Sequence, residues 1–325
     1  MIEHRRLALT VFLLLALGLP GAGCSKSNPA APPPVNVFLF QWGGHGSGDG
    51  EFQNPQGVAV DAAGHVFVAD QMNHRIQEFT GSGVFLRKWG SLGTDTTQFD
   101  QPRGVAVDDS GNVYVADAVN CRIQKFTGEG RFVTQWGGPG EGDGQFDWPR
   151  GLAVAADGSV YVADVVNCRI QVFTRNGEYR AQWGGRGYGH GRLNYPMGVA
   201  VDASGAVYVV ELYNHRVQKF THDGAYVAQW GGYGFANGYF VHPMSVAVDA
   251  SGDVYVGDVD NQRIQKFTGA GAYLTQWGTF GTAAGALNSP AGLAVDAAGE
   301  VYVTDTDNHR IQVFNPPPAS VALAR

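Results

Sequence analysis

Cysteine is scarce in this sequence, with three among 325 residues. A structural zinc site takes four cysteine or histidine ligands, usually in closely spaced pairs. Cys24, Cys121 and Cys168 are far apart and belong to no such cluster. The scarcity of cysteine therefore excludes a zinc-binding module.

Positive charge is also in short supply. The chain has 22 Lys and Arg against 29 Asp and Glu, which gives a formal net charge of −7 at pH 7. Phosphate backbones are bound by lysines and arginines concentrated on one face or stripe. An acidic chain with scattered arginines lacks that concentration, so we expect no nucleic-acid binding.

Long hydrophobic runs are missing, apart from one near the N-terminus. This run extends from Leu7 to Leu19, whereas a spanning helix needs about 20 apolar residues. Arg5 and Arg6 precede it, and the small residues of 20–24 follow it. This order is typical of an export signal, so residues 1–24 are predicted to be a signal peptide.

The end of this segment resembles the lipobox of bacterial lipoproteins, which would make Cys24 the acylated first residue of the mature chain. Gly21 stands where a lipobox has an aliphatic residue, so conventional cleavage and secretion is the alternative. Ser25, by resemblance to enterobacterial sorting, favours the outer membrane. Residues 25–36 are rich in proline and are predicted to be an extended tether. We therefore expect an exported protein of the cell envelope, in contact with the membrane through a lipid anchor alone.

What the sequence does contain is a pattern that occurs six times at intervals of 47 residues. Such self-similarity indicates a repeat architecture. The recurring residues are a proline (Pro55, Pro102, Pro149, Pro196, Pro243, Pro290), an asparagine (Asn73, Asn120, Asn167, Asn214, Asn261, Asn308), an arginine (Arg75, Arg122, Arg169, Arg216, Arg263, Arg310) and a tryptophan (Trp42, Trp89, Trp136, Trp183, Trp230, Trp277).

Each repeat contains four short apolar segments separated by glycine-containing turns. In the second repeat they are residues 104–108, 113–117, 122–127 and 131–136. Four antiparallel strands per repeat, closed by repetition, make a β-propeller blade. The fold class is therefore predicted to be all-β, a six-bladed β-propeller.

The two ends of the array complement each other. The chain begins with a lone fourth strand at residues 37–42, and the sixth repeat stops after its third strand at Phe314. We predict that the N-terminal strand pairs beside this third strand, because closure removes both exposed sheet edges. The propeller would then span residues 37–315 and leave residues 316–325 as a C-terminal tail.

Three recurring motifs, Pro-x-Gly-Val-Ala-Val-Asp, Gly-x-Val-Tyr-Val-Ala-Asp and Asn-His-Arg-Ile-Gln-x-Phe, closely resemble the NHL repeat. The resemblance covers about residues 37–315 and implies a six-bladed propeller. Three positions depart from the pattern: Ala155 replaces the first Asp of repeat three, Glu211 the second Asp of repeat four, and Ser245 a glycine of repeat five.

A carboxylate, an asparagine and an arginine recur together in every repeat. A catalytic centre needs one asymmetric constellation, so residues repeated six times are interpreted as structural. Arginine can donate several hydrogen bonds to carboxylates and carbonyls, and we expect a clamp between a strand end and its following loop. The clamp residues are Asp70, Asn73, Arg75, Asp117, Asn120, Arg122, Asp164, Asn167, Arg169, Glu211, Asn214, Arg216, Asp258, Asn261, Arg263, Asp305, Asn308 and Arg310.

The position between that asparagine and arginine holds His74, His215 and His309 in three repeats and Cys121 and Cys168 in two others. In a ring, equivalent positions of adjacent blades lie farther apart than the distance of about 7 Å between Cα atoms that a disulfide permits. We therefore expect free thiols. The same geometry keeps the histidines from sharing one metal, and no metal site or cofactor is predicted.

Binding residues should lie where the repeats differ. The loops between second and third strands, and those between blades, should emerge on one face, with the residues flanking each repeat proline at the channel mouth. Blades three to five bring large aromatic and methionine side chains there, a composition typical of interface hot spots. The candidates are Trp148, Arg150, Tyr188, Tyr195, Met197, Tyr233, Phe235, His242 and Met244. The alternative is that these side chains only pack the loops together.

The sequence therefore favours a monomeric extracytoplasmic interaction module that binds a protein, peptide or glycan. An enzyme is the alternative, because propellers resembling this one include lyases and lactonases with a metal in the central channel. General acid or base catalysis needs a partner group near the only histidine at the channel mouth, His242, and the sequence names none. The RNA binding of some NHL domains is disfavoured by the acidic charge.

Overall fold

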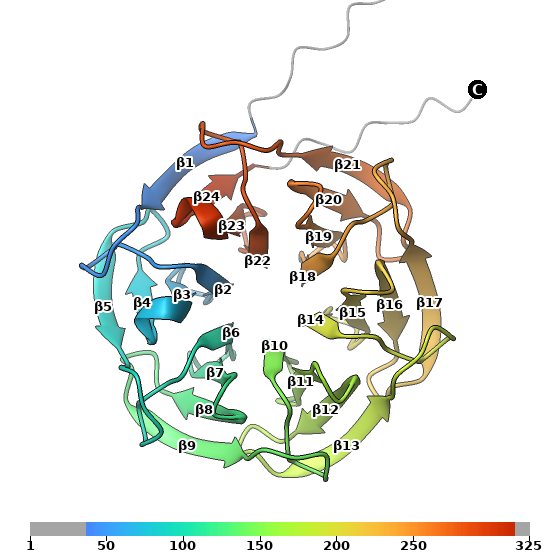
Figure 1. The fold of residues 1–325 in the computed structure, drawn as a ribbon, viewed down its shortest axis with the longest axis horizontal. Helices are drawn as coiled ribbons and strands as arrows, with labels where there is room; N and C mark the ends of the chain where they lie inside the picture. Colours follow the sequence, from blue (N-terminus) through green and yellow to red (C-terminus); the bar gives the residue numbers. More distant parts are fainter. Residues whose placement is uncertain (1–36, 316–325) are drawn as a thin grey trace, which may run out of the picture. The chain divides into compact units, whose positions relative to one another are not determined.

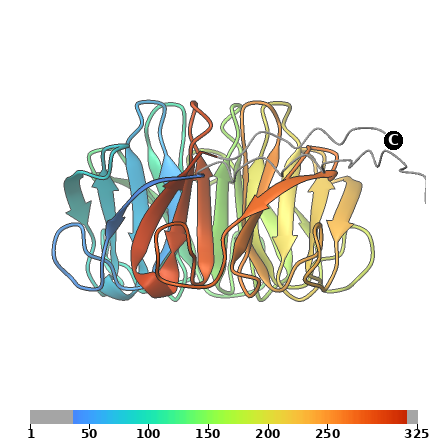
Figure 2. The same ribbon diagram turned by 90° about the horizontal axis from the view of Figure 1, so that it is seen from above.

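The computed structural model of the protein describes residues 37–315. Within them the chain forms 24 strands in six four-stranded antiparallel sheets. Figure 1 shows these sheets as blades around a central axis, and Figure 2 shows loops at both ends of the strands. The predicted six-bladed propeller is confirmed. No helix in this range is long and apolar enough to cross a bilayer.

The predicted signal peptide (1–24), tether (25–36) and tail (316–325) lie outside the described residues.

Blades one to five run outward in chain order, and blade six does so except that its outermost strand is β1. The innermost strands begin at the repeat prolines and are β2 (Pro55–Val60), β6 (Pro102–Val107), β10 (Pro149–Val154), β14 (Pro196–Val201), β18 (Pro243–Val248) and β22 (Pro290–Val295). The second strands are β3 (Val66–Asp70), β7 (Val113–Asp117), β11 (Val160–Asp164), β15 (Val207–Glu211), β19 (Val254–Asp258) and β23 (Val301–Asp305). The third strands are β4 (Arg75–Phe79), β8 (Arg122–Phe126), β12 (Arg169–Phe173), β16 (Arg216–Phe220), β20 (Arg263–Phe267) and β24 (Arg310–Phe314). The outer strands are β5 (Phe85–Trp89), β9 (Phe132–Gly137), β13 (Tyr179–Gly184), β17 (Tyr226–Gly231), β21 (Tyr273–Trp277) and β1 (Phe38–Gly43).

The strands differ in burial according to their place in the blade. The second strands are buried at every position, as in β7, because neighbouring blades cover both faces of the sheet. The outer strand β9 instead alternates between half-buried and exposed residues. This alternation is expected of a strand that has one face against the protein and one in water. Two short 3-10 turns, η1 (Gln71–Asn73) and η2 (Thr306–Asn308), connect second and third strands in blades one and six.

The ring is closed by strand β1. It pairs antiparallel with β24, with Trp42 opposite Ile311 and Gln41 opposite Gln312. Beyond the strand, the backbone N–H of Asn315 donates to the carbonyl of Val37 at 2.7 Å. Figure 1 shows the two ends side by side in the last blade. The predicted closure by the N-terminal strand is therefore confirmed.

The hydrophobic core lies between the blades. At the closing seam, Phe52 and Phe79 of blade one pack against Tyr302 and Ile311 of blade six, and Trp42 covers them. The ring centroids of Trp42 and Phe79 are 5.6 Å apart. The same tryptophan-to-phenylalanine contact joins each blade to the next, as in the pairs Trp89 with Phe126, Trp136 with Phe173, Trp183 with Phe220, Trp230 with Phe267 and Trp277 with Phe314.

The repeated carboxylate and arginine fasten each inter-blade loop. In blade three, Arg169 donates through Nε to Asp164 at 2.7 Å, and through both terminal nitrogens to three backbone carbonyls within residues 141–145. Asp164 also accepts from the backbone N–H of Asp147 at 2.8 Å and from Asn167. The clamp therefore ties the end of a second strand to the loop that enters the same blade.

The exception in blade four keeps this arrangement with a longer carboxylate. Glu211 accepts from Nε of Arg216 at 2.5 Å and from the backbone N–H of Asn194 at 2.9 Å. The added methylene is accommodated because the carboxylate still reaches both donors.

A ring of small residues lets the innermost strands approach closely around the axis. A Cβ at Gly104 would lie 1.9 Å from the carbonyl oxygen of Arg150 in the next blade. Ser245, which replaces the glycine in blade five, is tolerated because the adjacent strand has Gly257. A Cβ at Gly257 would meet the Ser245 hydroxyl at 2.3 Å, so the two substitutions compensate each other.

A chain that begins at residue 44 lacks β1 and is expected to lose the closed ring. It would expose the edge of β24 and remove Trp42 from the seam. Truncation of a core aromatic side chain alone costs about 3–5 kcal/mol. Here a whole strand is lost together with the partly buried Trp42, so the melting temperature should fall by about 10 °C or more. Calorimetry and light scattering, with a chain that begins at residue 37 as control, measure this. A monomer with an unchanged melting temperature would contradict it.

Candidate functional site

Two sets of loops share one face of the propeller, which we call the loop face. The backbone N–H of Met72, between second and third strands, donates to the carbonyl of Gln53 in the loop entering blade one. The clamps make the equivalent connection in every blade, for example between Arg75 and the carbonyls of Ser47 and Gly48. The predicted meeting of these loops on one face therefore follows from the hydrogen bonds.

The residue before each repeat proline has a left-handed backbone. These residues, with φ between 51° and 62°, are Asn54, Gln101, Trp148, Tyr195, His242 and Ser289. In four of the six, the backbone N–H donates to the side chain of the preceding blade: Asn54 to His309, Gln101 to His74, His242 to His215 and Ser289 to Gln262. The repeated histidines therefore link neighbouring blades through ring Nδ1.

A continuous series of rings crosses the loop face over blades four and five. We call it the aromatic ridge, and its members in order are Tyr195, Tyr213, His242, His215, Tyr233 and Phe235. Neighbouring ring centroids are 4.8, 5.9, 4.9, 5.2 and 6.1 Å apart, which is within contact distance for aromatic pairs. The Arg186 guanidinium lies over the Tyr195 ring at 5.6 Å and extends the ridge at one end.

Several aromatic side chains on this face are directed into solvent. Tyr188 is 79% exposed, Tyr233 64% and Phe235 71%. Rings that served only to pack the loops would be covered, so packing does not account for these three. A groove lies beside the ridge and is lined by Tyr188, Tyr213 and Tyr233, among others.

His242 is held by a hydrogen bond as well as by ring contacts. Its Nδ1 lies 2.6 Å from the Asp260 carboxylate. The structure therefore supplies the partner group for His242 that the sequence analysis did not find, because the two residues meet only through the packing of their loops. His215, which lies against it, is partly buried. Burial and the neighbouring His242 lower the pKa of His215, while Asp260 opposes them. His215 therefore favours the neutral form that accepts the hydrogen bond from the His242 backbone.

The structure separates the predicted binding residues into two groups. Trp148, Tyr188, Tyr195, Tyr233, Phe235 and His242 lie on the loop face. Arg150, Met197 and Met244 instead line the central channel, and 5% of Arg150 and 9% of Met197 is exposed. The division arises because the residue after each proline is the second residue of the innermost strand and projects toward the axis.

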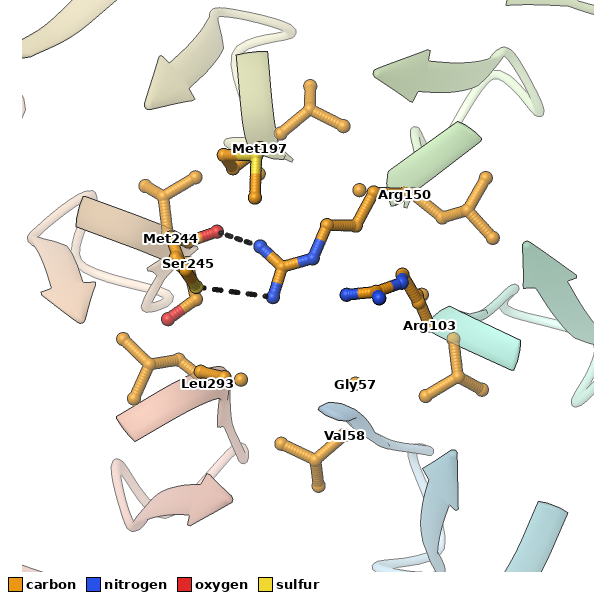
Figure 3. Close-up of a pocket in the computed structure, with 17 residues that line it drawn as sticks. Gly57, Val58, Arg103, Arg150, Met197, Met244, Ser245 and Leu293 are labelled. Carbon is orange, nitrogen blue, oxygen red and sulfur yellow. Dashed lines mark hydrogen bonds between the residues drawn. The ribbon is translucent and has the colours of Figure 1, made fainter. Parts of the chain in front are cut away.

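The channel offers no ligands for a metal. Its lining consists of glycines, aliphatic residues, two methionines, Ser245 and the two arginines Arg103 and Arg150, with no histidine or carboxylate (Figure 3). Residues 37–315 also contain no group of three or more His, Cys, Asp or Glu side chains arranged to hold a metal ion. The residues that line the channel therefore do not provide the ligands that a metal cation requires.

Four residues of these sites were not among the sequence candidates. Arg103 occupies the same repeat position as Arg150, so that position alone could have indicated it. Tyr213 and His215 lie in a short loop whose contact with the next blade depends on the ring arrangement. Arg186 joins the ridge through Tyr195, which no local sequence pattern predicts.

Comparison with known families agrees with the motif pattern. Six segments, residues 52–79, 99–126, 146–173, 193–220, 240–267 and 287–314, match the NHL repeat and together make up more than half of the chain. The protein belongs to the NHL-repeat family. Protein lin-41 from Caenorhabditis elegans is 38% identical over 80 residues, which are 22% of this NHL protein and 7% of lin-41. The chain thus spans less than a tenth of the length of that relative.

Solved structures share the fold at low sequence identity. A Bacteroides thetaiotaomicron protein of unknown function superposes with a TM-score of 0.67 and 17% identity, covering 85% of this chain and 76% of that one. A streptogramin B lyase superposes with a TM-score of 0.61 and 15% identity, and the match covers 86% of this chain and 98% of the lyase. A catalytically inactive virginiamycin B lyase from Staphylococcus aureus with quinupristin superposes with a TM-score of 0.60 and 14% identity. That match covers 87% of this chain and 99% of the lyase. At these identities the likeness shows the propeller fold alone.

Replacing His309 by Gln is expected to reduce the acid sensitivity of the seam between blades six and one. Burial, assisted by His45, lowers the pKa of His309, so protonation below the unfolded value of about 6.5 is disfavoured in the folded state. The stability that neutral His309 contributes to the folded state is therefore present above that pH and is lost as the pH falls. Gln262 accepts the equivalent hydrogen bond without titrating.

Melting temperatures from pH 8 to pH 5 test this expectation. Wild type should lose a few °C more than His309→Gln, since one hydrogen bond contributes about 1 kcal/mol and this corresponds to about 2–4 °C. At pH 8 the two proteins should melt alike. Equal losses on acidification would show that His309 does not titrate in this range.

Proposed function

We propose that this NHL protein is an interaction module whose aromatic ridge binds a protein or peptide partner. The observation that carries the proposal is the continuous ridge with exposed Tyr233 and Phe235 at one end and Arg186 at the other. The membership of the NHL family and the propeller fold support a binding role.

The chemistry of the ridge favours a protein partner. Tyrosine and arginine are the residues in which interface binding energy concentrates, because each has a large contact area and a polar group. The backbone beneath is fastened by the clamps of blades four and five, so little ordering cost is expected on binding. Asp260 adds a negative charge beside His242, which favours partners that present a cation or a hydrogen-bond donor.

The ring orientations argue against a glycan as the principal ligand. Tyr233 makes a 72° angle with Phe235 and a 66° angle with His215. Rings turned edge to face present no common flat surface on which a sugar ring could stack. The groove beside the ridge, lined by Tyr188, Tyr213 and Tyr233, instead offers room for side chains of a peptide.

The enzymatic alternative lacks support in the channel. A metal-assisted lyase or lactonase would need His or carboxylate ligands there, and the lining provides two arginines instead. Two positive charges oppose the approach of a metal ion. We therefore propose no catalytic role and no cofactor.

We also propose that the module is exported and anchored through Cys24, with the loop face available to extracytoplasmic partners. The proposal rests on the sequence of residues 1–24 and on the proline-rich residues 25–36. The acidic net charge of −7 is consistent with a partner other than nucleic acid.

The double variant Tyr233→Ala with Phe235→Ala should bind partner peptides at least tenfold more weakly than wild type, because hot-spot truncations cost about 2 kcal/mol or more. Peptides selected from a displayed library on the wild-type protein provide the probe, and fluorescence anisotropy measures their affinity. Leu92 and Phe280 occupy the repeat position of Tyr233 in other blades and are comparably exposed, so Leu92→Ala and Phe280→Ala are matched controls. An equal loss of peptide affinity in the controls, or no loss in the double variant, would refute the assignment of the ridge as the binding site. If glycans on an array bind the wild type and not the double variant, the ligand is a sugar.

Replacing Cys24 by Ser should abolish lipid attachment without changing the propeller. In a bacterial host fed a labelled fatty acid, wild type should carry the label and sediment with membranes. The variant should lack the label and appear in soluble fractions. A wild-type protein that is exported without label would instead indicate conventional cleavage.

A further inference from the structure

We propose that Arg103 and Arg150 form an anion-binding site in the central channel, which takes a compact oxyanion group such as a phosphate or a carboxylate (Figure 3). This site is separate from the aromatic ridge and does not depend on the ridge binding a partner.

The two arginines come from the same position of adjacent blades. Each is the second residue of an innermost strand, β6 for Arg103 and β10 for Arg150, and both project into the channel. The other blades place uncharged residues at this position, namely Gln56, Met197, Met244 and Ala291. Both positive charges therefore come from two adjacent blades of an otherwise neutral ring.

Arg150 is fixed across the channel. It is 5% exposed and donates to the Met244 carbonyl at 3.3 Å and to the Gln56 side-chain oxygen at 2.9 Å. Its second terminal nitrogen also lies 3.6 Å from the Met244 sulfur. These partners are neutral, so they orient the guanidinium and leave its charge uncompensated.

Arg103 is oriented by an aromatic ring. Its guanidinium lies over the Trp148 ring at 5.2 Å from the centroid. Its Nε is buried and has no hydrogen-bond partner among residues 37–315. A buried donor without an acceptor is costly, so this atom is available to a ligand oxygen.

The contrast with the clamps shows what these arginines lack. In the same two blades Arg122 and Arg169 each lie 2.7 Å from a buried carboxylate. The channel lining contains no acidic residue, and its walls are glycines and aliphatic side chains such as Val105 and Leu152. Burial lowers the pKa of both channel arginines, and the charge of Arg103 lowers that of Arg150 further. A bound anion would compensate two charges that the protein itself leaves unpaired.

The space favours a small group. The cavity measures about 70 Å³, enough for several water molecules or one compact oxyanion. Guanidinium groups bind phosphate and carboxylate through paired N–H donors, and the buried Nε of Arg103 has no acceptor among the described residues. A free inorganic anion and a carboxylate-bearing small molecule have the same recognition chemistry.

Calorimetric titration of the full chain with sodium phosphate and, separately, sodium acetate tests the site, with sodium chloride at equal ionic strength as reference. Arg103→Met and Arg150→Met introduce the residue that blades four and five already have at this position. Each should bind the preferred anion at least tenfold more weakly than wild type. The control variant Arg131→Met replaces an exposed arginine, so it changes the net charge by the same amount, and it should bind the anion as wild type does.

Thermal unfolding provides a second readout that a purely structural role would not produce. In buffer without oxyanions, both channel variants should melt at or above the wild-type temperature, because an uncompensated buried charge is removed. Phosphate or acetate should raise the melting temperature of wild type and not of these variants. If a methionine variant does not fold, Arg103→Gln is used in its place, because blade one has a glutamine, Gln56, at this position. The proposal is overturned if neither anion binds, if the channel variants retain binding, or if Arg131→Met loses it equally.

Discussion

The clamp between a buried carboxylate and an arginine is the interaction on which the rest of this propeller depends. In every blade the carboxylate ends the second strand, the arginine begins the third, and the arginine also donates to carbonyls of the loop entering the blade. The arginines are largely buried, so an unpaired partner would be strongly destabilising. Six such clamps fix the height and direction of every loop on one face.

A face held in this way can vary in sequence without losing its backbone. The residue before each proline is left-handed whether it is Asn54, Trp148 or Tyr195, because the strand and clamp on either side determine the turn. Blades three to five use this freedom for rings, and the other blades place smaller residues there. The family membership explains the shared frame, whereas the ridge is a property of this chain.

The channel and the ridge follow different physical rules, although Pro196 alone separates Tyr195 from Met197. On the rim, exposed rings are stabilised by contact with one another and leave area for a partner. In the channel, neighbouring backbones approach so closely that glycine is required, and Gly257 compensates for the one serine. Arg103 and Arg150 are unusual in this setting because their charges face aliphatic walls.

The sequence by itself determined the number of blades, the strand order and the closing partner, because a 47-residue period and two complementary ends admit one closed ring. It also indicated that blades three to five bring large aromatic and methionine side chains to the channel mouth. Only the tertiary structure decided which of these residues meet. It turned Arg150, Met197 and Met244 toward the axis and linked Tyr213 and His215 to His242 across a blade boundary. The physical reason is that the direction of a side chain at the start of a strand depends on the register and twist of the neighbouring blades. The spacing of residues within one repeat contains no information about either.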